Sequence, residues 1–189
     1  LGMGGSSMTS LALNELFNKS LENGPPYVKS HVVDTVIPAT ITEIGKKLEP
    51  SKTLFFVSSK SGSTLETLSL ESHFRSLQNP EAKDSTSIRN FIALSDPHTP
   101  LSERAQAGEF GTWVSTPEDV GGRFSALSAF GMVPAAAAGL DLTKFAEYSV
   151  LMAHRCRSDS TDNPGLALGA FMAANALKGR DKVTLITPK

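Results

Sequence analysis

The chain has 189 residues, 40% of them hydrophobic and 20% charged, which excludes a disordered tail and a disulfide-stapled miniprotein. Its 18 basic and 19 acidic side chains give a net charge of -1, so it lacks the basic excess of a nucleic-acid-binding protein. A single cysteine, Cys156, and the absence of an apolar signal-like start favour a cytoplasmic location. The most apolar segment, residues 126–142, is interrupted by glycine and proline, so no membrane span is expected.

Short β-branched runs alternate along the chain with segments of helical spacing, which is typical of a parallel sheet covered by helices. The expected strands are residues 31–36, 53–57, 88–94, 112–114 and 183–186. The expected helices are residues 8–21, 38–48, 64–77, 123–138, 143–154 and 165–177. Pro134 is expected to kink or end the helix that contains it. Polar turn formers predict loops at residues 78–87 and 157–164.

The two ends of the sequence have the pattern of interrupted elements. Residues 1–4 resemble the exit from a strand with no strand before it, and residues 183–186 resemble a strand followed at once by the terminus. We therefore expect one doubly wound α/β domain that is cut at both ends.

Two loops rich in glycine and hydroxyl groups, residues 2–7 and 58–64, stand where an expected strand leads into an expected helix. In a parallel sheet such loops line the binding crevice, and the following helix presents free N–H groups and its positive dipole end. Glycine allows close approach of the backbone, and hydroxyls donate hydrogen bonds. Both loops are therefore candidate anion-binding sites.

Helix capping is the simpler alternative for both loops. Residues 63–66 form a Ser-x-x-Glu capping box, and Ser6 or Ser7 could cap the first helix. A cap needs one hydroxyl, however, whereas residues 58–64 offer five together with Lys60. The second loop therefore exceeds what capping requires.

Nucleotide binding and hydrolysis are two further alternatives with weaker support. Residues 2–7 approach a dinucleotide fingerprint, but Ser7 stands at the third glycine position and Asp34 lies too far downstream for the ribose-binding acid. No Gly-x-x-x-x-Gly-Lys-Ser/Thr loop and no Gly-x-Ser-x-Gly elbow occurs. Ser59 and Lys60 could form a nucleophilic dyad, but adjacent side chains on an extended loop diverge.

A third feature is the segment of residues 118–125, which contains paired glycines and Arg123 just before an expected helix. A cation at a helix start is mildly unfavourable, so a binding role explains Arg123 better than a purely structural one. The histidines show no paired metal-ligand spacing, and Cys156 is isolated from other soft ligands. No metal site and no cofactor are therefore expected.

Three motifs occur in a specific order: Gly-Met-Gly-Gly-Ser at residues 2–6, Ser-Lys-Ser-Gly-Ser-Thr-Leu-Glu-Thr at 59–67 and Gly-Gly-Arg-Phe-Ser at 121–125. This combination resembles the phosphoglucose isomerase family in its bacterial form, including the isomerase half of transaldolase fusions. The resemblance extends over essentially the whole chain. It implies a sugar isomerase domain, a flavodoxin-like three-layer α/β/α sandwich with a central parallel sheet. Residues 1–160 would form the first such domain, and residues 161–189 would begin the following segment.

The resemblance also assigns roles to individual residues. Those assigned to the sugar-phosphate site are Gly5, Ser6, Ser59, Lys60, Ser61, Gly62, Ser63 and Thr64. Gly122 would lie beside the substrate, and Arg123 would stabilise the negative charge of an enediolate as the catalytic residue. Where many relatives have Thr-Phe-Thr, this chain has Ser-Gly-Ser at residues 61–63, which keeps the hydroxyls and removes an aromatic ring.

The implied reaction interconverts glucose 6-phosphate and fructose 6-phosphate through a cis-enediol, and it requires a general base. The family supplies this base as a Glu in a motif resembling Glu-Ser-x-Gly-Lys, which the 189 residues do not contain. Glu66 and Glu118 are the carboxylates nearest to the loops in sequence, and neither matches that base. The expectation is a domain that binds a small sugar phosphate without turning it over, within a parent that is a homodimer. A non-catalytic sugar-phosphate sensor is the alternative.

Overall fold

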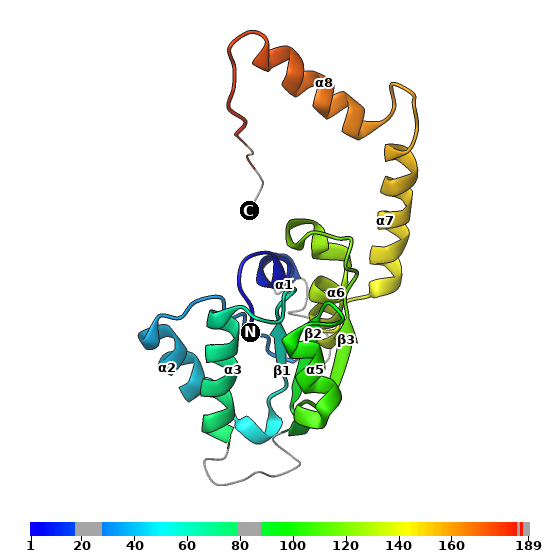
Figure 1. The fold of residues 1–189 in the computed structure, drawn as a ribbon. Coiled ribbons are helices and arrows are strands. Elements are labelled where there is room, and N and C mark those ends of the chain that lie inside the picture. The colour runs from blue at the N-terminus through cyan, green and yellow to red at the C-terminus, as the bar shows by residue number, and fades with distance from the viewer. Residues whose placement is uncertain (18–27, 79–87, 185, 187–189) are drawn as a thin grey trace. The chain divides into compact units, whose positions relative to one another are not determined.

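The computed structural model describes residues 1–17, 28–78, 88–184 and 186. Its centre is a parallel sheet of three strands in the order β1 (Phe55–Ser58), β2 (Phe91–Ser95) and β3 (Thr112–Ser115) (Figure 1). Phe55 pairs with Phe91, and Ile92 pairs with Thr112. Helices contact the sheet, α3 (Leu65–Gln78) at β1 and α5 (Pro100–Arg104) at β2, so the predicted α/β class is confirmed.

The core lies where alternate strand residues meet these helices. Phe55 and Phe91 stack with ring centroids 4.7 Å apart, and Phe74 of α3 lies 5.4 Å from Phe55. Such cross-strand aromatic pairs stabilise a sheet because they bury large apolar surfaces against each other. The buried core residues are Val33, Phe55, Val57, Leu70, Phe74, Phe91, Ala93, Leu101 and Phe110.

The remaining helices agree largely with the expected ones. Their bounds are α1 Gly5–Phe17, α2 Pro38–Lys47, α6 Ala129–Ala137, α7 Leu142–Cys156 and α8 Pro164–Ala176. Short helical turns occupy Pro50–Lys52 and Gly122–Leu127, and a π-helical turn at Ala105–Glu109 follows α5. Neither α5 nor the π-helical turn was expected from the sequence pattern. The expected ends at residues 18–21 and the loop at residues 79–87 lie outside the described residues.

The prediction of a strand at residues 31–36 is wrong, because this segment has no regular structure. It nevertheless lies beside Gly2, which in turn lies beside β1. Gly2 forms a parallel bridge to Ser58 of β1, and its N–H donates to the Val33 carbonyl at 3.2 Å. Val33 is buried in the core, which explains the apolar pattern of the segment. The expected strand at residues 183–186 is also wrong for its described residues, which have no regular structure.

The expected helix at residues 123–138 is divided at Ser128, and Pro134 does not break it. The Ser128 hydroxyl donates to the Ser125 carbonyl at 2.7 Å and accepts from the Phe130 amide, so it ends one turn and starts α6. Pro134 lies inside α6 and offers no N–H to the Phe130 carbonyl four residues earlier. Ser10 of α1 donates to that carbonyl at 3.4 Å, which compensates the lost bond.

The described chain divides into two compact units, Leu1–Leu140 and Asp141–Lys189. In the second unit Asn163 joins α7 to α8: its amide nitrogen donates to the Cys156 and Ser158 carbonyls, and its amide oxygen caps α8. The predicted boundary at residues 160 and 161 stays a prediction.

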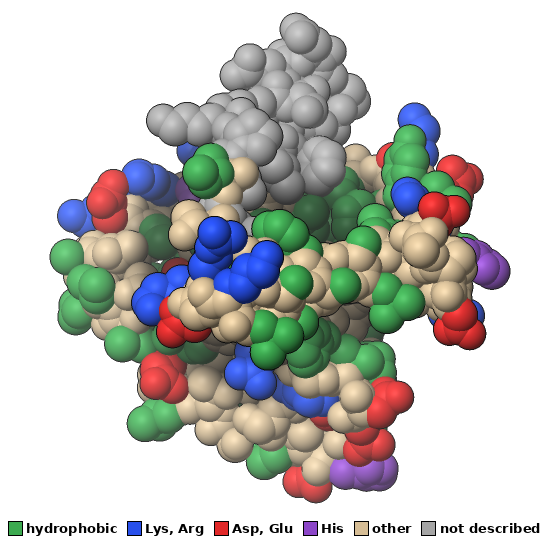
Figure 2. All heavy atoms as spheres, turned by 90° about the horizontal axis from the view of Figure 1, so that it is seen from above, with side chains coloured by type: hydrophobic (Ala, Val, Ile, Leu, Met, Phe, Trp, Pro, Cys, Tyr) green, Lys and Arg blue, Asp and Glu red, His purple; other side chains and the backbone are tan. Residues whose placement is uncertain are grey.

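Hydrophobic side chains are visible at the surface of the molecule (Figure 2), and α8 has no buried residue. Within the described residues, no helix is long and apolar enough to cross a membrane.

Candidate functional site

The carboxyl ends of the three strands meet at one edge of the sheet and hold each other in register. The Ser59 amide donates to the Leu94 carbonyl at 3.0 Å, and the Asp96 amide donates to the Lys60 carbonyl at 3.3 Å. The Thr116 amide donates to the Ser95 carbonyl at 3.0 Å. The parallel ladder therefore continues one or two residues past the strands, and it fixes the first residues of three loops side by side.

The loop of residues 59–64, which follows β1, is internally braced. The buried Ser59 hydroxyl forms a hydrogen bond with the Thr64 hydroxyl at 2.9 Å, which joins the first and last residues of the loop. Gly62 has a φ of 66° and packs so closely on Thr99 that a Cβ atom there would lie 2.7 Å from the Thr99 side chain. Only glycine satisfies both conditions, so this position holds the loop against the start of α5.

The capping alternative fails for this loop. The Ser63 hydroxyl donates to the Ser61 hydroxyl at 3.2 Å, and no hydrogen bond joins it to Glu66 among the described residues. The amides of Leu65, Glu66 and Thr67 likewise have no acceptor in the described part of the chain. The N-terminus of α3 therefore keeps free N–H donors, as an anion site at a helix N-terminus requires.

The first loop does not cap α1 through its serines either. The Ser7 hydroxyl is buried and donates backwards to the Gly4 carbonyl at 3.1 Å, and Ser6 is half-buried. The structure shows a genuine capping box elsewhere, at α5, where Thr99 and Ser102 bond each other reciprocally. The two candidate loops therefore differ from an ordinary capped helix start.

Both loops open into one pocket of about 500 Å³ at this edge of the sheet. The residues that line it are Met3, Gly5, Ser6, Lys60, Ser61, Thr64, Asp96, Pro97, Thr99, Glu118 and Gly122. Six of the predicted site residues thus come together: Gly5, Ser6, Lys60, Ser61, Thr64 and Gly122. The other three residues predicted in this loop do not line the pocket: Ser59 and Gly62 are buried, and Ser63 is exposed.

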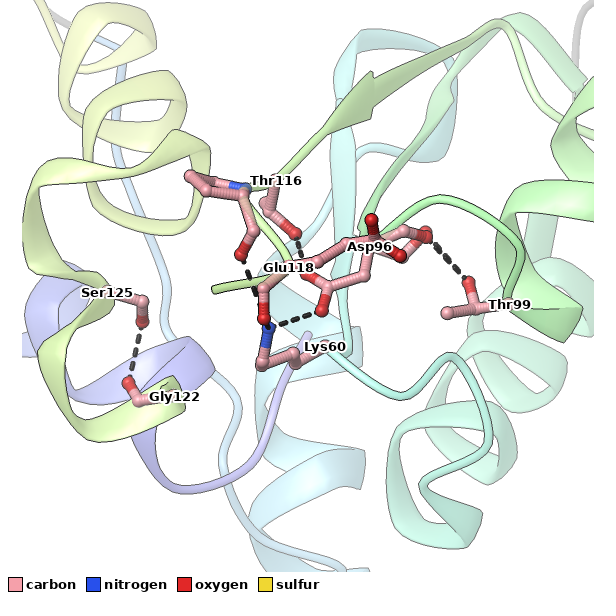
Figure 3. Close-up of polar contacts among 9 residues, drawn as sticks. Lys60, Asp96, Thr99, Thr116, Glu118, Gly122 and Ser125 are labelled. Atoms are coloured by element: carbon pink, nitrogen blue, oxygen red, sulfur yellow. Dashed lines mark hydrogen bonds and ion pairs between the residues drawn. The ribbon is translucent and has the colours of Figure 1, made fainter. Parts of the chain in front are cut away.

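Lys60 occupies the middle of the site, where its ammonium faces protein acceptors (Figure 3). It forms an ion pair with Asp96 and donates to the backbone carbonyls of Pro117 and Glu118 at 3.3 and 3.2 Å. Its side chain is 28% exposed, and that of Asp96 is 12% exposed. The positive charge of Lys60 is therefore largely balanced by Asp96.

Asp96 is a site residue that was not identified from sequence. Its second carboxylate oxygen accepts from the Thr116 hydroxyl, and its backbone carbonyl accepts from the Thr99 hydroxyl at 2.9 Å. A signal was present, because Asp96 and Thr116 each follow an expected strand closely, as the first residues of the Ser59 loop do. Polar residues at the carboxyl ends of neighbouring parallel strands share one edge.

The segment of Gly122 and Arg123 meets the first loop directly. A Cβ atom at Gly5 would lie 2.3 Å from the Gly122 carbonyl oxygen, so the two backbones are in contact. The Ser125 hydroxyl donates to that carbonyl at 2.6 Å, which closes the turn (Figure 3). Arg123 itself does not line the pocket, and it forms no ion pair within the described residues. Its guanidinium is therefore available to a ligand.

The described residues contain no group of three or more His, Cys, Asp or Glu side chains that could hold a metal ion. Chemically, the pocket offers the hydroxyl groups of Ser6, Ser61 and Thr64, and the free N–H groups at the start of α3 follow Thr64 directly in the chain. This donor set suits a phosphate ester.

Comparison with known proteins gives one consistent match. The sequence model of the family described as Phosphoglucose isomerase matches residues 1–181. A glucose-6-phosphate isomerase from Carboxydothermus hydrogenoformans is 37% identical over 179 residues, which cover 88% of this chain and 37% of the relative. One from Thermus thermophilus is 38% identical over 144 residues, covering 75% of this chain and 32% of the relative. The chain thus spans well under half the length of these relatives.

Solved structures agree with the sequence matches. A hypothetical protein from Thermus thermophilus superimposes with a TM-score of 0.82 and 31% identity, over 92% of this chain and 40% of that one. A glucose-6-phosphate isomerase from Chlamydia trachomatis superimposes with a TM-score of 0.60 and 27% identity, over 72% of this chain and 25% of that one. The similarity therefore extends from the sequence motifs to the arrangement of the backbone.

Proposed function

The chain belongs to the phosphoglucose isomerase family, and on that premise we propose that its pocket binds the phosphate of glucose 6-phosphate or fructose 6-phosphate. The observation that carries the proposal is the junction of two hydroxyl-rich loops at the uncapped N-terminus of α3. Ser6, Ser61 and Thr64 line this junction. Ser59 supports it from behind through its hydrogen bond to Thr64.

The electrostatics of the pocket favour recognition by hydrogen bonds. Because Asp96 balances Lys60, attraction for a phosphate comes mainly from hydroxyl dipoles and from the free amides of α3. Such donors suit a phosphate monoester, whose oxygens accept several hydrogen bonds at once. A neutral sugar lacks that group, so binding is proposed to depend on the ester.

Arg123 is proposed as the electrostatic residue of the reaction. It follows Gly122, which lines the pocket, and its guanidinium has no competing ion pair in the described chain. A guanidinium beside the first two sugar carbons would stabilise the charge that develops on an enediolate oxygen. No Glu-Ser-x-Gly-Lys segment occurs in these residues, so we propose that the chain binds the substrate without supplying the general base.

Titration calorimetry of the 189-residue chain with fructose 6-phosphate, fructose and inorganic phosphate tests this proposal. We expect binding of the phosphate ester and no measurable binding of fructose. Thr64→Val should weaken ester binding about tenfold, the usual contribution of one hydrogen bond to a charged group. Thr40→Val is the matched control, because Thr40 is exposed on α2 and does not line the pocket.

Equal binding of fructose and its 6-phosphate, or an unchanged affinity in Thr64→Val, would contradict the proposal. An isomerisation assay on the same chain separates binding from catalysis. We expect turnover indistinguishable from the uncatalysed rate. A rate comparable with that of an intact isomerase would show that these residues hold a base of their own.

A further inference from the structure

We infer that Lys60 positions the Gly122–Arg123 loop and does not contact the substrate phosphate. This inference rests on the proposed function, since it concerns how the same pocket is assembled. The family resemblance places Lys60 among the phosphate ligands. The geometry points instead to a clamp that joins the ends of all three strands.

The hydrogen-bonding capacity of Lys60 is the first argument. A lysine ammonium has three N–H donors and no acceptor. In the structure it has three protein acceptors, namely the Asp96 carboxylate and the carbonyls of Pro117 and Glu118. Every donor is used, so a phosphate contact would require one of these bonds to break.

The surroundings of Asp96 make such a rearrangement unfavourable. One carboxylate oxygen is held by Lys60 and the other by the Thr116 hydroxyl, while the Asp96 amide donates to the Lys60 carbonyl. The side chain of Asp96 is only 12% exposed. If the ammonium turned toward the pocket, a mostly buried carboxylate would lose its counter-ion, which is strongly destabilising.

The position of the two carbonyls defines what the clamp does. Thr116 is anchored to β2 by its amide, and Gly122 is in backbone contact with Gly5. The carbonyls of Pro117 and Glu118 lie between these two anchors, and Lys60 holds both of them. Lys60 therefore sets the path of the segment that leads to Gly122 at the pocket and to Arg123 after it (Figure 3).

The two possible roles predict opposite effects for Asp96→Asn. If Lys60 contacted phosphate, removing its counter-ion would free the ammonium, and affinity for phosphate would rise. If Lys60 is a positioning residue, both Asp96→Asn and Lys60→Met disrupt the clamp. We then expect both variants to weaken fructose 6-phosphate binding about tenfold while the affinity for inorganic phosphate changes by less than about threefold.

Three comparisons complete the binding experiment. The double variant Lys60→Met/Asp96→Asn should bind fructose 6-phosphate no more weakly than either single variant does. Each single substitution already breaks the same clamp, so the two losses should not add. Lys60→Arg, which keeps the charge and the donors, should recover most of the lost affinity. Lys52→Met is the control, since Lys52 is an exposed lysine paired only with Glu49 among the described residues. Higher ester affinity in Asp96→Asn, or additive losses in the double variant, would overturn the inference.

Amide hydrogen exchange tests the clamp independently of any ligand. Lys60→Met should accelerate exchange in residues 118–125 and leave the amides of β2 unchanged. Unchanged exchange in residues 118–125 would refute the positioning role even if the chain bound sugar phosphate normally. Conversely, if the wild-type chain bound no sugar phosphate, the proposed function would fail while exchange still decided whether Lys60 holds this segment.

Discussion

Gly62 and Gly108 share a left-handed backbone, with φ angles of 66° and 87°, but only Gly62 of the two is enclosed by other residues. A Cβ atom at Gly62 would lie 2.7 Å from the Thr99 side chain and 2.8 Å from the Leu101 amide nitrogen. At Gly108 nothing in the described chain lies within 4 Å of that position. The pair therefore separates the cost of the backbone conformation from the cost of a steric clash.

We predict that Gly62→Ala destabilises the chain by about 3 kcal/mol, because backbone strain and overpacking add. Gly108→Ala should destabilise the chain by only about 1 kcal/mol, because only the left-handed backbone conformation is unfavourable for alanine there. Urea unfolding of both variants measures the difference. Equal losses would mean that the loop of residues 59–64 moves away from Thr99 without penalty, and the packing argument would then be wrong.

Local sequence patterns predict some residues of the site and not others. The loop of residues 59–64 was recognisable because its hydroxyls and glycine are contiguous in sequence. Asp96 and Thr116 are single residues on two other loops, and only the strand register brings them to Lys60. Their importance depends on which strands are neighbours, and local sequence patterns do not contain that information.

At the scale of elements, a cluster of charges around the buried Glu71 joins α3 to α5 and to the π-helical turn. Glu71 of α3 is 2% exposed and accepts from Arg75 at 2.7 Å and from both terminal nitrogens of Arg104. Arg104 also bonds Glu109, and the hydrogen bonds to Glu71 and Glu109 raise the pKa of Arg104. This cluster holds α5 in a place that no helical periodicity indicated.

Glu71→Gln should therefore destabilise the chain by about 2 kcal/mol, since it leaves two guanidinium groups without their shared carboxylate. The loss is moderated because both arginines reach solvent. Glu43→Gln is the control, since Glu43 pairs with Lys47 on an exposed helix face and should show no measurable change. Equal denaturation midpoints for wild type and Glu71→Gln would show that apolar packing alone places α5.

Elements with strong periodicity were predicted well, and elements defined by tertiary contacts were not. The strands at β1, β2 and β3 and the helices α2, α3, α7 and α8 lie within a few residues of their expected ranges. The segment around Val33 has the composition of a strand, but among the described residues its only backbone hydrogen bond to a neighbouring segment comes from Gly2. Pro134 stays helical because Ser10, from another helix, satisfies the carbonyl that proline leaves free.

At the scale of the whole molecule, the complete pocket lies within the unit Leu1–Leu140. The net charge of -1 gives no indication of the anion site that we propose. Lys60 is balanced by Asp96, so the pocket relies on hydroxyl groups and helix N–H groups, which carry no formal charge. The sequence motifs predict residues that the fold brings together at one pocket, and the proposed binding there needs no excess of cations.

The most direct test of a sugar-phosphate site at the N-terminus of α3 is to map fructose 6-phosphate binding by amide chemical-shift perturbation on the 189-residue chain. We predict that the ester shifts the amides of residues 5–7, 61–67 and 121–124, and that inorganic phosphate shifts mainly residues 61–67. Fructose should shift none of them. Perturbations confined to α7 and α8, or none at saturating ester, would contradict a site at this position.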